Sequence, residues 1–268
     1  MKTAKLADGT EVYCLVRDEA VVLDHHVAGY LTNGIRIADG DVVFDVGANI
    51  GVFGLRVVQR HANARVYAFE PVPPIFAVLA ENAAHHGDGR LRAMPCGLSR
   101  AAATVSLTYF PHSPALSTAH PEMWDDDPGA LQRAVKGSLQ HPPPSLWWTR
   151  WVPGFMHGAI ARRMRAGSST HACALRTLSS VIDGESVERI DLLKIDCEGA
   201  ELEVLLGIEA RHWPRIRQVV VEVHDIDGRL TTVQDMLAQH GFNNIIAVQE
   251  PALRETRLFN IHATRAAG

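Results

Sequence analysis

The stretch Leu192–Glu201, LLKIDCEGAE, begins like a buried strand and then carries a lysine and three acids within eight residues. Side chains alternate between the two faces of a strand, so Lys194, Asp196 and Glu198 should share one face. Charged side chains are rarely fully buried unless they are paired. This strand end therefore predicts either a site for chemistry or a structural network of ion pairs.

A second stretch of the same kind is Gln218–His224, QVVVEVH, which ends with an acid and a histidine. The same alternation places Glu222 and His224 on one face. In an open α/β sheet, ligands bind outside the carboxyl ends of the parallel strands. If the two strands are neighbours, four polar side chains converge at that edge of the sheet: Asp196, Glu198, Glu222 and His224.

Two kinds of catalysis suit this group of side chains. Histidine has an unperturbed pKa near neutrality, so His224 is a candidate general base that takes a proton from a substrate hydroxyl. In this hypothesis, Asp196 and Glu222 orient the histidine or the substrate. Alternatively, the same three residues would bind Mg²⁺ or another hard divalent cation, and the cation would lower the pKa of the hydroxyl.

A purely structural interpretation of these residues also remains open. Lys194 would neutralise Asp196 or Glu222, because an unpaired buried ammonium group is costly. Glu201 would cap the helix that begins near Gly199, where acids are favoured by the helix dipole. We favour the capping role for Glu201.

The stretch Val42–Gly51, VVFDVGANIG, is the strongest local signal for ligand binding. A buried strand runs into Asp45, a loop with two glycines follows, and a helix comes next. Glycines allow a sharp turn and a close approach of the backbone to a ligand. Glu70 ends the next strand, where its carboxylate can accept hydrogen bonds from both hydroxyls of a ribose.

This loop differs from the loops that bind nucleotide phosphates. It lacks the GxGxxG spacing of dinucleotide-binding proteins and the Gly-Lys-Ser/Thr of a P-loop. A nucleoside without a pyrophosphate fits better, which points to S-adenosylmethionine. The competing interpretation is an ordinary strand-turn-helix without a ligand.

Three motifs together resemble the FkbM-type family of S-adenosylmethionine-dependent methyltransferases: VVFDVGANIG, AFEPVPP (Ala68–Pro74) and DLLKIDCEGAELEVLLG (Asp191–Gly207). The resemblance covers roughly residues 34–227 and implies a class I methyltransferase fold with a seven-stranded sheet. It also implies methyl transfer to oxygen in natural products, sugars or lipids. The predicted cofactor-binding residues are Asp45, Gly47, Ala48, Asn49, Gly51, Glu70, Pro71 and Asp196.

The elements that would position these residues alternate between strand and helix, which indicates a mostly parallel α/β sheet with helices on both faces. Residues 1–38 should form an N-terminal extension, a hairpin over Lys5–Val16 and a helix over Asp18–Tyr30 with Asp18 as its N-cap. Residues 39–268 should form the Rossmann-like methyltransferase domain. Its first half should hold strands at 41–46, 65–69 and 91–94 and helices at 52–61 and 75–85.

The second half of the domain should repeat this alternation. We expect strands at 171–176, 190–195 and 218–223 and helices at 177–182, 199–206 and 230–240. The runs 244–249 and 257–264 should close the sheet as an antiparallel pair.

The alternation is interrupted from about residue 109 to 170, which predicts an inserted helical lid because so long a plain loop is unusual. Ser117, Thr118 and His120 are candidate contacts to the substrate, together with Glu198. Further along, tryptophans at 147, 148 and 151 lie beside Arg150, and a basic helix is expected at 155–164. Buried tryptophans, a face that docks an acyl carrier protein, and a membrane interface are the competing interpretations.

Composition narrows the class of protein without identifying the substrate. The chain has 268 residues, 47% of them hydrophobic, and a formal net charge of −4, which gives no sign of nucleic-acid binding. The four scattered cysteines and the absence of a signal peptide or transmembrane segment predict a cytoplasmic protein with reduced thiols, with membrane contact not expected. A homodimer is compatible with the sequence.

The predicted function is O-methylation of a hydroxyl group on a natural product of a polyketide or peptide pathway. A hydroxyacyl unit bound to a carrier protein is one candidate acceptor. The alternatives are a free sugar or lipid hydroxyl as acceptor, or an NAD(P)-dependent oxidoreductase on a similar sheet. The missing GxGxxG motif argues against the oxidoreductase.

Overall fold

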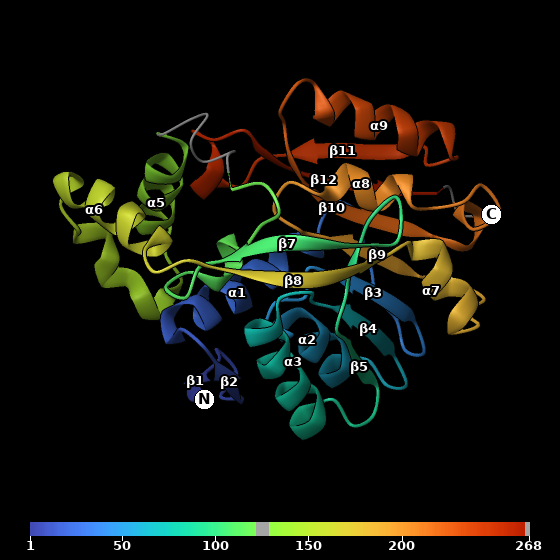
Figure 1. Ribbon diagram of the computed structural model, residues 1–268, viewed down its shortest axis with the longest axis horizontal. Coiled ribbons are helices and arrows are strands. Elements are labelled where there is room, and N and C mark those ends of the chain that lie inside the picture. The colour runs from blue at the N-terminus through green and yellow to red at the C-terminus, as the bar shows by residue number, and fades with distance from the viewer. Residues whose placement is uncertain (122–128, 266–268) are drawn as a thin grey trace.

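Seven strands form the central sheet of the computed structural model, which describes residues 1–121 and 129–265 (Figure 1). In space they run in the order β11-β12-β10-β9-β3-β4-β5, and only the pairs that β12 makes are antiparallel. The predicted parallel sheet with an antiparallel closing pair is confirmed. The strands are β3 (Val42–Val46), β4 (Arg65–Phe69), β5 (Leu91–Met94), β9 (Leu192–Ile195), β10 (Gln218–His224), β11 (Asn244–Val248) and β12 (Leu258–Thr264).

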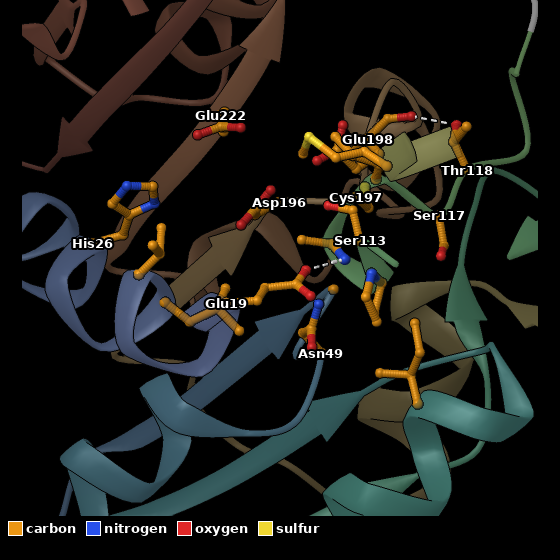
Figure 2. Close-up of a pocket in the computed structure, with 18 of the residues that line it drawn as sticks. Glu19, His26, Asn49, Ser113, Ser117, Thr118, Asp196, Cys197, Glu198 and Glu222 are labelled. Atoms are coloured by element: carbon orange, nitrogen blue, oxygen red, sulfur yellow. Dashed lines mark hydrogen bonds between the residues drawn. The ribbon is translucent and has the colours of Figure 1, made fainter. Parts of the chain in front are cut away.

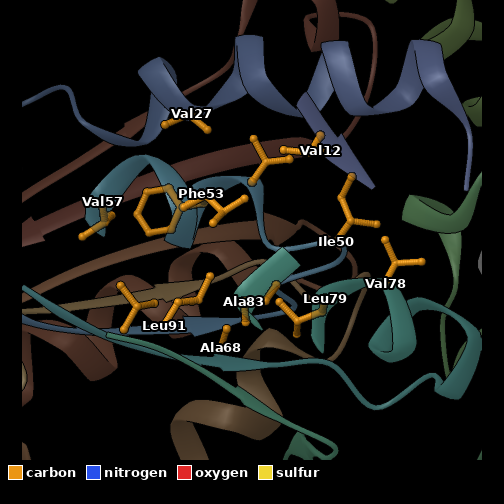
Figure 3. Packing of buried hydrophobic residues seen from close by; sticks show 14 of the residues in the cluster. Val12, Val27, Ile50, Phe53, Val57, Ala68, Val78, Leu79, Ala83 and Leu91 are labelled. Atoms are coloured by element: carbon orange, nitrogen blue, oxygen red, sulfur yellow. The ribbon is translucent and has the colours of Figure 1, made fainter. Parts of the chain in front are cut away.

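Helices cover both faces of this sheet, because successive strand residues point to opposite sides and both sides are apolar. Val43 packs into a core with α1 (Arg17–Tyr30), α2 (Val52–Arg60) and α3 (Pro73–His86), part of which is drawn in Figure 3. Its neighbour Phe44 packs into a second core on the opposite face. The helices of that face are α7 (Leu178–Gly184), α8 (Glu201–Leu206) and α9 (Arg229–Gln239).

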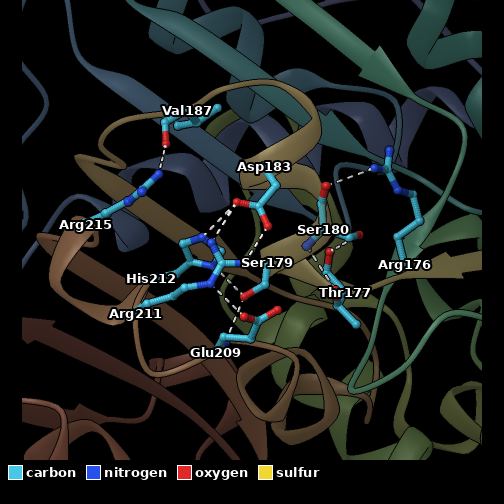
Figure 4. A network of polar contacts seen from close by, with 10 residues as sticks. All are labelled: Arg176, Thr177, Ser179, Ser180, Asp183, Val187, Glu209, Arg211, His212 and Arg215. Carbon is cyan, nitrogen blue, oxygen red and sulfur yellow. Dashed lines mark hydrogen bonds and ion pairs between the residues drawn. The ribbon is translucent and has the colours of Figure 1, made fainter.

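The second face is also fixed by a polar network between α7 and the segment before β10 (Figure 4). His212 is fully buried, and its ring nitrogens lie 2.7 Å from the Ser179 hydroxyl and 3.2 Å from an Asp183 carboxylate oxygen. Arg211 forms an ion pair with Asp183 at 2.7 Å. The segment continues through η3 (Trp213–Arg215) into β10. These contacts stabilise the sheet at a distance from the candidate site.

The N-terminal extension contains the predicted hairpin, built from β1 (Lys2–Lys5) and β2 (Glu11–Cys14). Helix α1 follows, but its N-cap is Val16 and no side chain caps it, so the prediction of Asp18 as N-cap is wrong. Asp18 instead lies in the first turn, where its charge still suits the helix dipole. Because α1 belongs to the first core, the extension packs directly on the central sheet.

The region expected as a lid lies between two neighbouring strands of a separate small sheet. This sheet has the order β6-β8-β7 and consists of β6 (Gly97–Leu98), β7 (Ala103–Tyr109) and β8 (Ser169–Arg176). Strand β7 was not predicted, although Val105, Leu107 and Tyr109 alternate with polar residues along it. We call residues 110–168 the lid. Its described elements are η1 (Pro114–Leu116), α5 (Ala130–Gln140), η2 (Pro144–Trp151) and α6 (Gly154–Arg165).

The lid also includes residues 122–128, with the tryptophan at position 124, which lie outside the described residues. A last short element, η4 (Pro251–Leu253), lies against α5. Within 1–121 and 129–265, none of the helices has the length and apolar character needed to cross a bilayer.

Candidate active site

The loop between β3 and α2 lies where the strand order of the sheet reverses, since β3 pairs with both β4 and β9. Open α/β sheets bind ligands at such a switch point. The backbone N–H groups of Gly47 and Ala48 both donate to the carbonyl of Phe69, at 3.1 and 2.9 Å. Gly47 and Asn49 have left-handed backbone conformations with φ of 74° and 50°. These bonds hold the loop over the carboxyl ends of β3 and β4.

Gly47 is the residue of this loop that tolerates no side chain. A Cβ atom there would lie 1.6 Å from the carbonyl oxygen of Asp196, on the neighbouring strand end. We expect Gly47→Ala to prevent stable folding, or to lower the melting temperature by at least 10 °C. Gly40→Ala is the matched control, because Gly40 has a similar φ of 78° but nothing within 4 Å of its Cβ position. Gly40→Ala should lower the free energy of unfolding by only about 1–2 kcal/mol, which is the cost of an alanine in the left-handed conformation. Equal melting temperatures for the two variants would refute the steric argument.

Glu70 has the geometry that a nucleoside site needs. It is buried at the end of β4, and its two oxygens accept hydrogen bonds from the backbone N–H groups of Val72, at 2.9 Å, and Asn49, at 3.2 Å. A carboxylate has about four acceptor positions, so two remain for ribose hydroxyls. Glu70, Asn49 and Pro71 all line the same cavity. The residues present therefore fit the nucleoside part of S-adenosylmethionine.

Burial also changes the acidity of two glutamates in this cavity. It raises the pKa of Glu70 to about 8, although two backbone hydrogen bonds oppose the shift. Burial likewise raises the pKa of Glu19, on α1, to about 8. The N–H of Ala115, in the lid, donates to the Glu19 carboxylate. Sequence reasoning missed Glu19, because its neighbours in the cavity come from distant parts of the chain.

These pKa values predict how stability depends on pH. Each glutamate ionises near 4.5 in the unfolded chain and near 8 in the folded one, so the folded protein holds more protons between these values. Stability should therefore fall as the pH rises from 4.5 to 8, by about 1.4 kcal/mol per pH unit and glutamate. Urea titrations at a series of pH values measure this slope. The stability of Glu70→Gln and of Glu19→Gln should each fall less steeply with pH than that of wild type, by about 1.4 kcal/mol per pH unit. Unchanged slopes in both variants would contradict the shifted values.

Lys194 is the buried cation of the site. Its ammonium lies 3.0 Å from Asp45 and 3.4 Å from Asp196, and it donates to the Gly47 carbonyl at 3.3 Å. Burial opposes its charge, but the two carboxylates outweigh burial and raise the pKa of Lys194. The predicted pairing with Asp196 is present, and the second partner is Asp45. Tyr30 adds a hydrogen bond, donating from its hydroxyl to Asp196 at 2.9 Å.

Three carboxylates face one another beside this ion pair (Figure 2). Asp196 and Glu198 follow β9, Glu222 lies on β10, and one oxygen of each falls within 4.8 Å of the others. All three line the cavity. Burial and the charges of Asp196 and Glu198 raise the pKa of Glu222 well above its usual range. Such a cluster can accept a proton near neutral pH.

His224 is close to this cluster but has a different environment. Its Nε2 lies 3.5 Å from Glu198 and its Nδ1 lies 3.5 Å from Glu201. Burial opposes its charge, yet the two glutamates raise the pKa of His224 well above its usual value. His224 is not among the residues that line the cavity. Its predicted roles as general base and as metal ligand therefore stay predictions, and the three carboxylates lie closer to the cavity.

Glu201 is the first residue of α8 and contacts His224, but no side chain caps this helix. It is fully buried, and one of its oxygens accepts a hydrogen bond from the N–H of Gly199 at 2.7 Å, just before α8. This agrees with the expected helix-start position. The hydrogen bond from Gly199 to Glu201 helps to hold the loop after β9, in which Glu198 has a left-handed backbone conformation with a φ of 49°.

The lid reaches the cluster through Thr118. Its hydroxyl donates to the carbonyl of Glu198 at 2.6 Å and accepts the N–H of His120 at 2.9 Å. Ser117, Thr118 and His120 all line the cavity, as does Glu198. The structure thus brings the predicted substrate residues into the cavity that is also lined by Asn49.

The cavity joins these parts and has a volume of 1020 Å³. Of the predicted site residues, Gly47, Ala48, Asn49, Glu70, Pro71, Asp196 and Glu222 line it along with the lid residues. Asp45 and Gly51 do not line it, and their predicted contact with the cofactor stays a prediction. Asp45 is fully buried behind Lys194, and Gly51 is the left-handed N-cap of α2. Sequence reasoning also missed the apolar wall formed by α5, η2 and α6.

A sheet with this strand order, and a nucleoside-shaped site at its switch point, define a class I methyltransferase that uses S-adenosylmethionine. Residues 45–243 match the family model described as the methyltransferase FkbM domain, and the chain belongs to this family. The resemblance seen in the motifs is thereby confirmed, and the oxidoreductase alternative is wrong.

Related proteins indicate which methyltransferases are similar. The chain is 36% identical over its whole length to the 31-O-demethyl-FK506 methyltransferase FkbM of Streptomyces tacrolimicus, and covers 98% of it. It is 35% identical to methyltransferase sdnD of Sordaria araneosa, over 88% of this chain and 87% of that protein. It is 34% identical, over 88% of its length, to part of the AMB antimetabolite synthetase AmbE of Pseudomonas aeruginosa, of which it covers 11%.

A solved structure supports the fold alone. The crystal structure of a methyltransferase FkbM from Methylobacillus flagellatus superposes with a TM-score of 0.52 at 14% identity, covering 92% of this chain and 55% of that one.

Proposed function

We propose that this enzyme transfers a methyl group to a hydroxyl of a natural-product acceptor. The observation that carries the proposal is the single cavity in which the Gly47–Asn49 loop and Glu70 face the carboxylates of Asp196, Glu198 and Glu222. The loop and Glu70 suit the methyl donor, and the carboxylates beside them offer a proton acceptor for an alcohol. The relatives named as a 31-O-demethyl-FK506 methyltransferase and an antimetabolite synthetase favour acceptors of this class.

The residues of the cavity would have separate roles in this reaction. S-adenosylmethionine, when bound, supplies an activated methyl group on a sulfonium. Glu70 and Asn49 hold the nucleoside, and the lid excludes water and orients the acceptor, which provides much of the rate gain. The carboxylate cluster takes the hydroxyl proton, with Glu222 as the principal acceptor. His224 is a positioning residue that fixes Glu198.

The size and polarity of the cavity favour a large acceptor with apolar surface. Its lid wall includes Leu131, Val135, Leu139, Ile160 and Met164, which a small hydrophilic sugar would not contact well. A free sugar or lipid hydroxyl therefore remains the second choice. An acceptor carried by an acyl carrier protein is considered in the next section.

A divalent cation at Asp196, Glu198 and Glu222 finds no support in the comparisons, and the proposed proton transfer does not need one. If the carboxylates accept the proton themselves, treatment with EDTA should leave the rate of methyl transfer unchanged. A loss of activity that Mg²⁺ restores would refute this part of the proposal.

Binding and product mass test the proposed function. S-adenosylhomocysteine should raise the melting temperature, and NADH should not. With S-adenosylmethionine and a hydroxylated polyketide or peptide, the product should gain one methylene in mass, and fragmentation should place it on oxygen. Methylation on nitrogen or carbon would refute the proposed reaction.

A further inference from the structure

The outer side of the lid carries an unusual group of exposed aromatic side chains. Seven large apolar side chains are exposed in the described residues, and five of them lie within residues 147–156. Trp147, Trp151 and Phe155 are 58%, 75% and 86% exposed. A concentration of this kind in one place usually marks an interaction site. We call these three residues, with Arg150, Arg162 and Arg163, the lid face.

The arginines of the lid face make it basic. Arg150, Arg162 and Arg163 are exposed, and no ion pair joins them to a carboxylate in the part of the chain that the structure describes. Exposed arginines elsewhere, such as Arg100 and Arg211, do pair with acids. Residues 129–182 contain no aspartate or glutamate at all. The lid face therefore attracts an acidic partner.

The cavity opens at this face. Trp148 and Met156 line the cavity, yet they are 52% and 42% exposed. They lie on η2 and in the first turn of α6, directly beside Trp147 and Phe155 in the sequence. The same cavity is lined by apolar residues of the lid helices and by the carboxylate cluster. A group that enters beside Trp148 can reach the methyl-transfer end without leaving the protein that carries it.

We propose that the lid face docks an acidic acyl carrier protein, and that the acceptor hydroxyl enters the cavity while attached to the flexible arm of that carrier. This inference rests on the proposed function and adds the partner. A bound carrier would place its arm at the opening beside Trp148. Tethering would raise the local concentration of the acceptor.

The composition of the lid face favours a protein over a membrane. Tryptophan, phenylalanine, methionine and arginine are the residues enriched in protein interfaces, whereas lysine is depleted, and residues 144–168 contain no lysine. Membrane-binding clusters have about four to eight basic residues, and the lid face has three. Its aromatic residues also lie on η2 and one turn of α6, not along one side of a long amphipathic helix. A symmetric contact with a second copy would place arginines against arginines.

A binding measurement tests the docking surface directly. Fluorescently labelled holo acyl carrier protein and a peptidyl carrier domain serve as probes, with anisotropy as the readout at low salt. Trp151→Ala and Arg163→Glu should each weaken binding about tenfold, as interface anchors do. The matched controls are Leu206→Ala, another exposed apolar residue, and Arg60→Glu, an exposed arginine in the last turn of α2. Neither control should change the affinity.

A rate measurement separates this inference from the proposed function. The same hydroxyacyl group is offered on the carrier and on free pantetheine. Trp151→Ala should lower kcat/KM for the carrier form about tenfold and leave it unchanged for the pantetheine form. If neither form is methylated while wild-type binding still exceeds that of the variants, the proposed reaction fails and the docking surface stands.

Three results would overturn the inference. The first is equal carrier binding by wild type and both lid-face variants. The second is binding to vesicles of anionic phospholipid that Trp151→Ala abolishes, with no binding of either carrier. The third is a dimer in sedimentation that Trp151→Ala converts to a monomer.

Discussion

Replacing Lys194 with methionine is expected to lower the free energy of unfolding by about 3–5 kcal/mol, which is the cost of breaking a buried ion pair. Lys194 and Asp45 are both almost fully buried, at 3.0 Å from each other. Within the described residues, no hydrogen-bond donor other than Lys194 serves the Asp45 carboxylate. Methionine fills the space of the lysine stem but leaves Asp45 and Asp196 without a counter-ion.

The same variant should also weaken cofactor binding, because Lys194 donates to the Gly47 carbonyl in the loop that we propose holds the cofactor. Urea unfolding measures the first effect, and calorimetry with S-adenosylhomocysteine measures the second. Lys136→Met is the control, since Lys136 pairs with Glu255 at 2.7 Å on the surface and should cost less than about 1 kcal/mol. The double variant Lys194→Met/Asp45→Asn should regain part of the loss, since it removes the unpaired charge. Equal stability of the two lysine variants would show that the buried pair contributes nothing.

The sheet could be predicted because each of its strands carries its own local pattern. The runs 42–46, 65–69 and 218–224 are short, apolar and followed by a helix or a turn. Strand β7 was missed although Val105, Leu107 and Tyr109 alternate with polar residues, and it pairs with β8 over seven residues in the separate small sheet. The N-cap of α1 was misassigned because residue type alone does not determine where a helix begins. Asp18 has the composition of a cap, but packing of α1 on the first core starts the helix earlier.

The candidate site was predicted only in part, because some of its contacts join residues that are far apart in the sequence. The motifs identified the loop at Gly47, Glu70 and the acids of β9 and β10, because neighbouring parallel strands end at one edge. Tyr30 is 166 residues from Asp196, and Glu19 is 96 residues from Ala115. No local pattern records such contacts. The environment of His224 also depends on Glu201, whose side chain turns back toward β10.

Replacing Glu222 with glutamine is expected to lower kcat by about 10²- to 10⁴-fold, the range typical for loss of a general base. Glu222 lines the cavity, and burial and two neighbouring carboxylates raise its pKa well above its usual range. The reaction needs its ionised form, so wild-type kcat/KM should rise with pH through this raised pKa. The affinity for S-adenosylhomocysteine should change less than about threefold, because the proposed contacts to the nucleoside come from Glu70 and Asn49.

Two further variants decide between Glu222 and His224 as the proton acceptor. Glu203→Gln is the control for a glutamate at the cavity wall, since Glu203 pairs with Arg100 and takes no part in the cluster. Its kcat should stay within about twofold of wild type. His224→Gln should lower kcat about tenfold, because Glu198 loses a charged partner but the proton acceptor stays. If His224→Gln instead abolishes turnover while Glu222→Gln retains it, the histidine is the base despite its two glutamate neighbours.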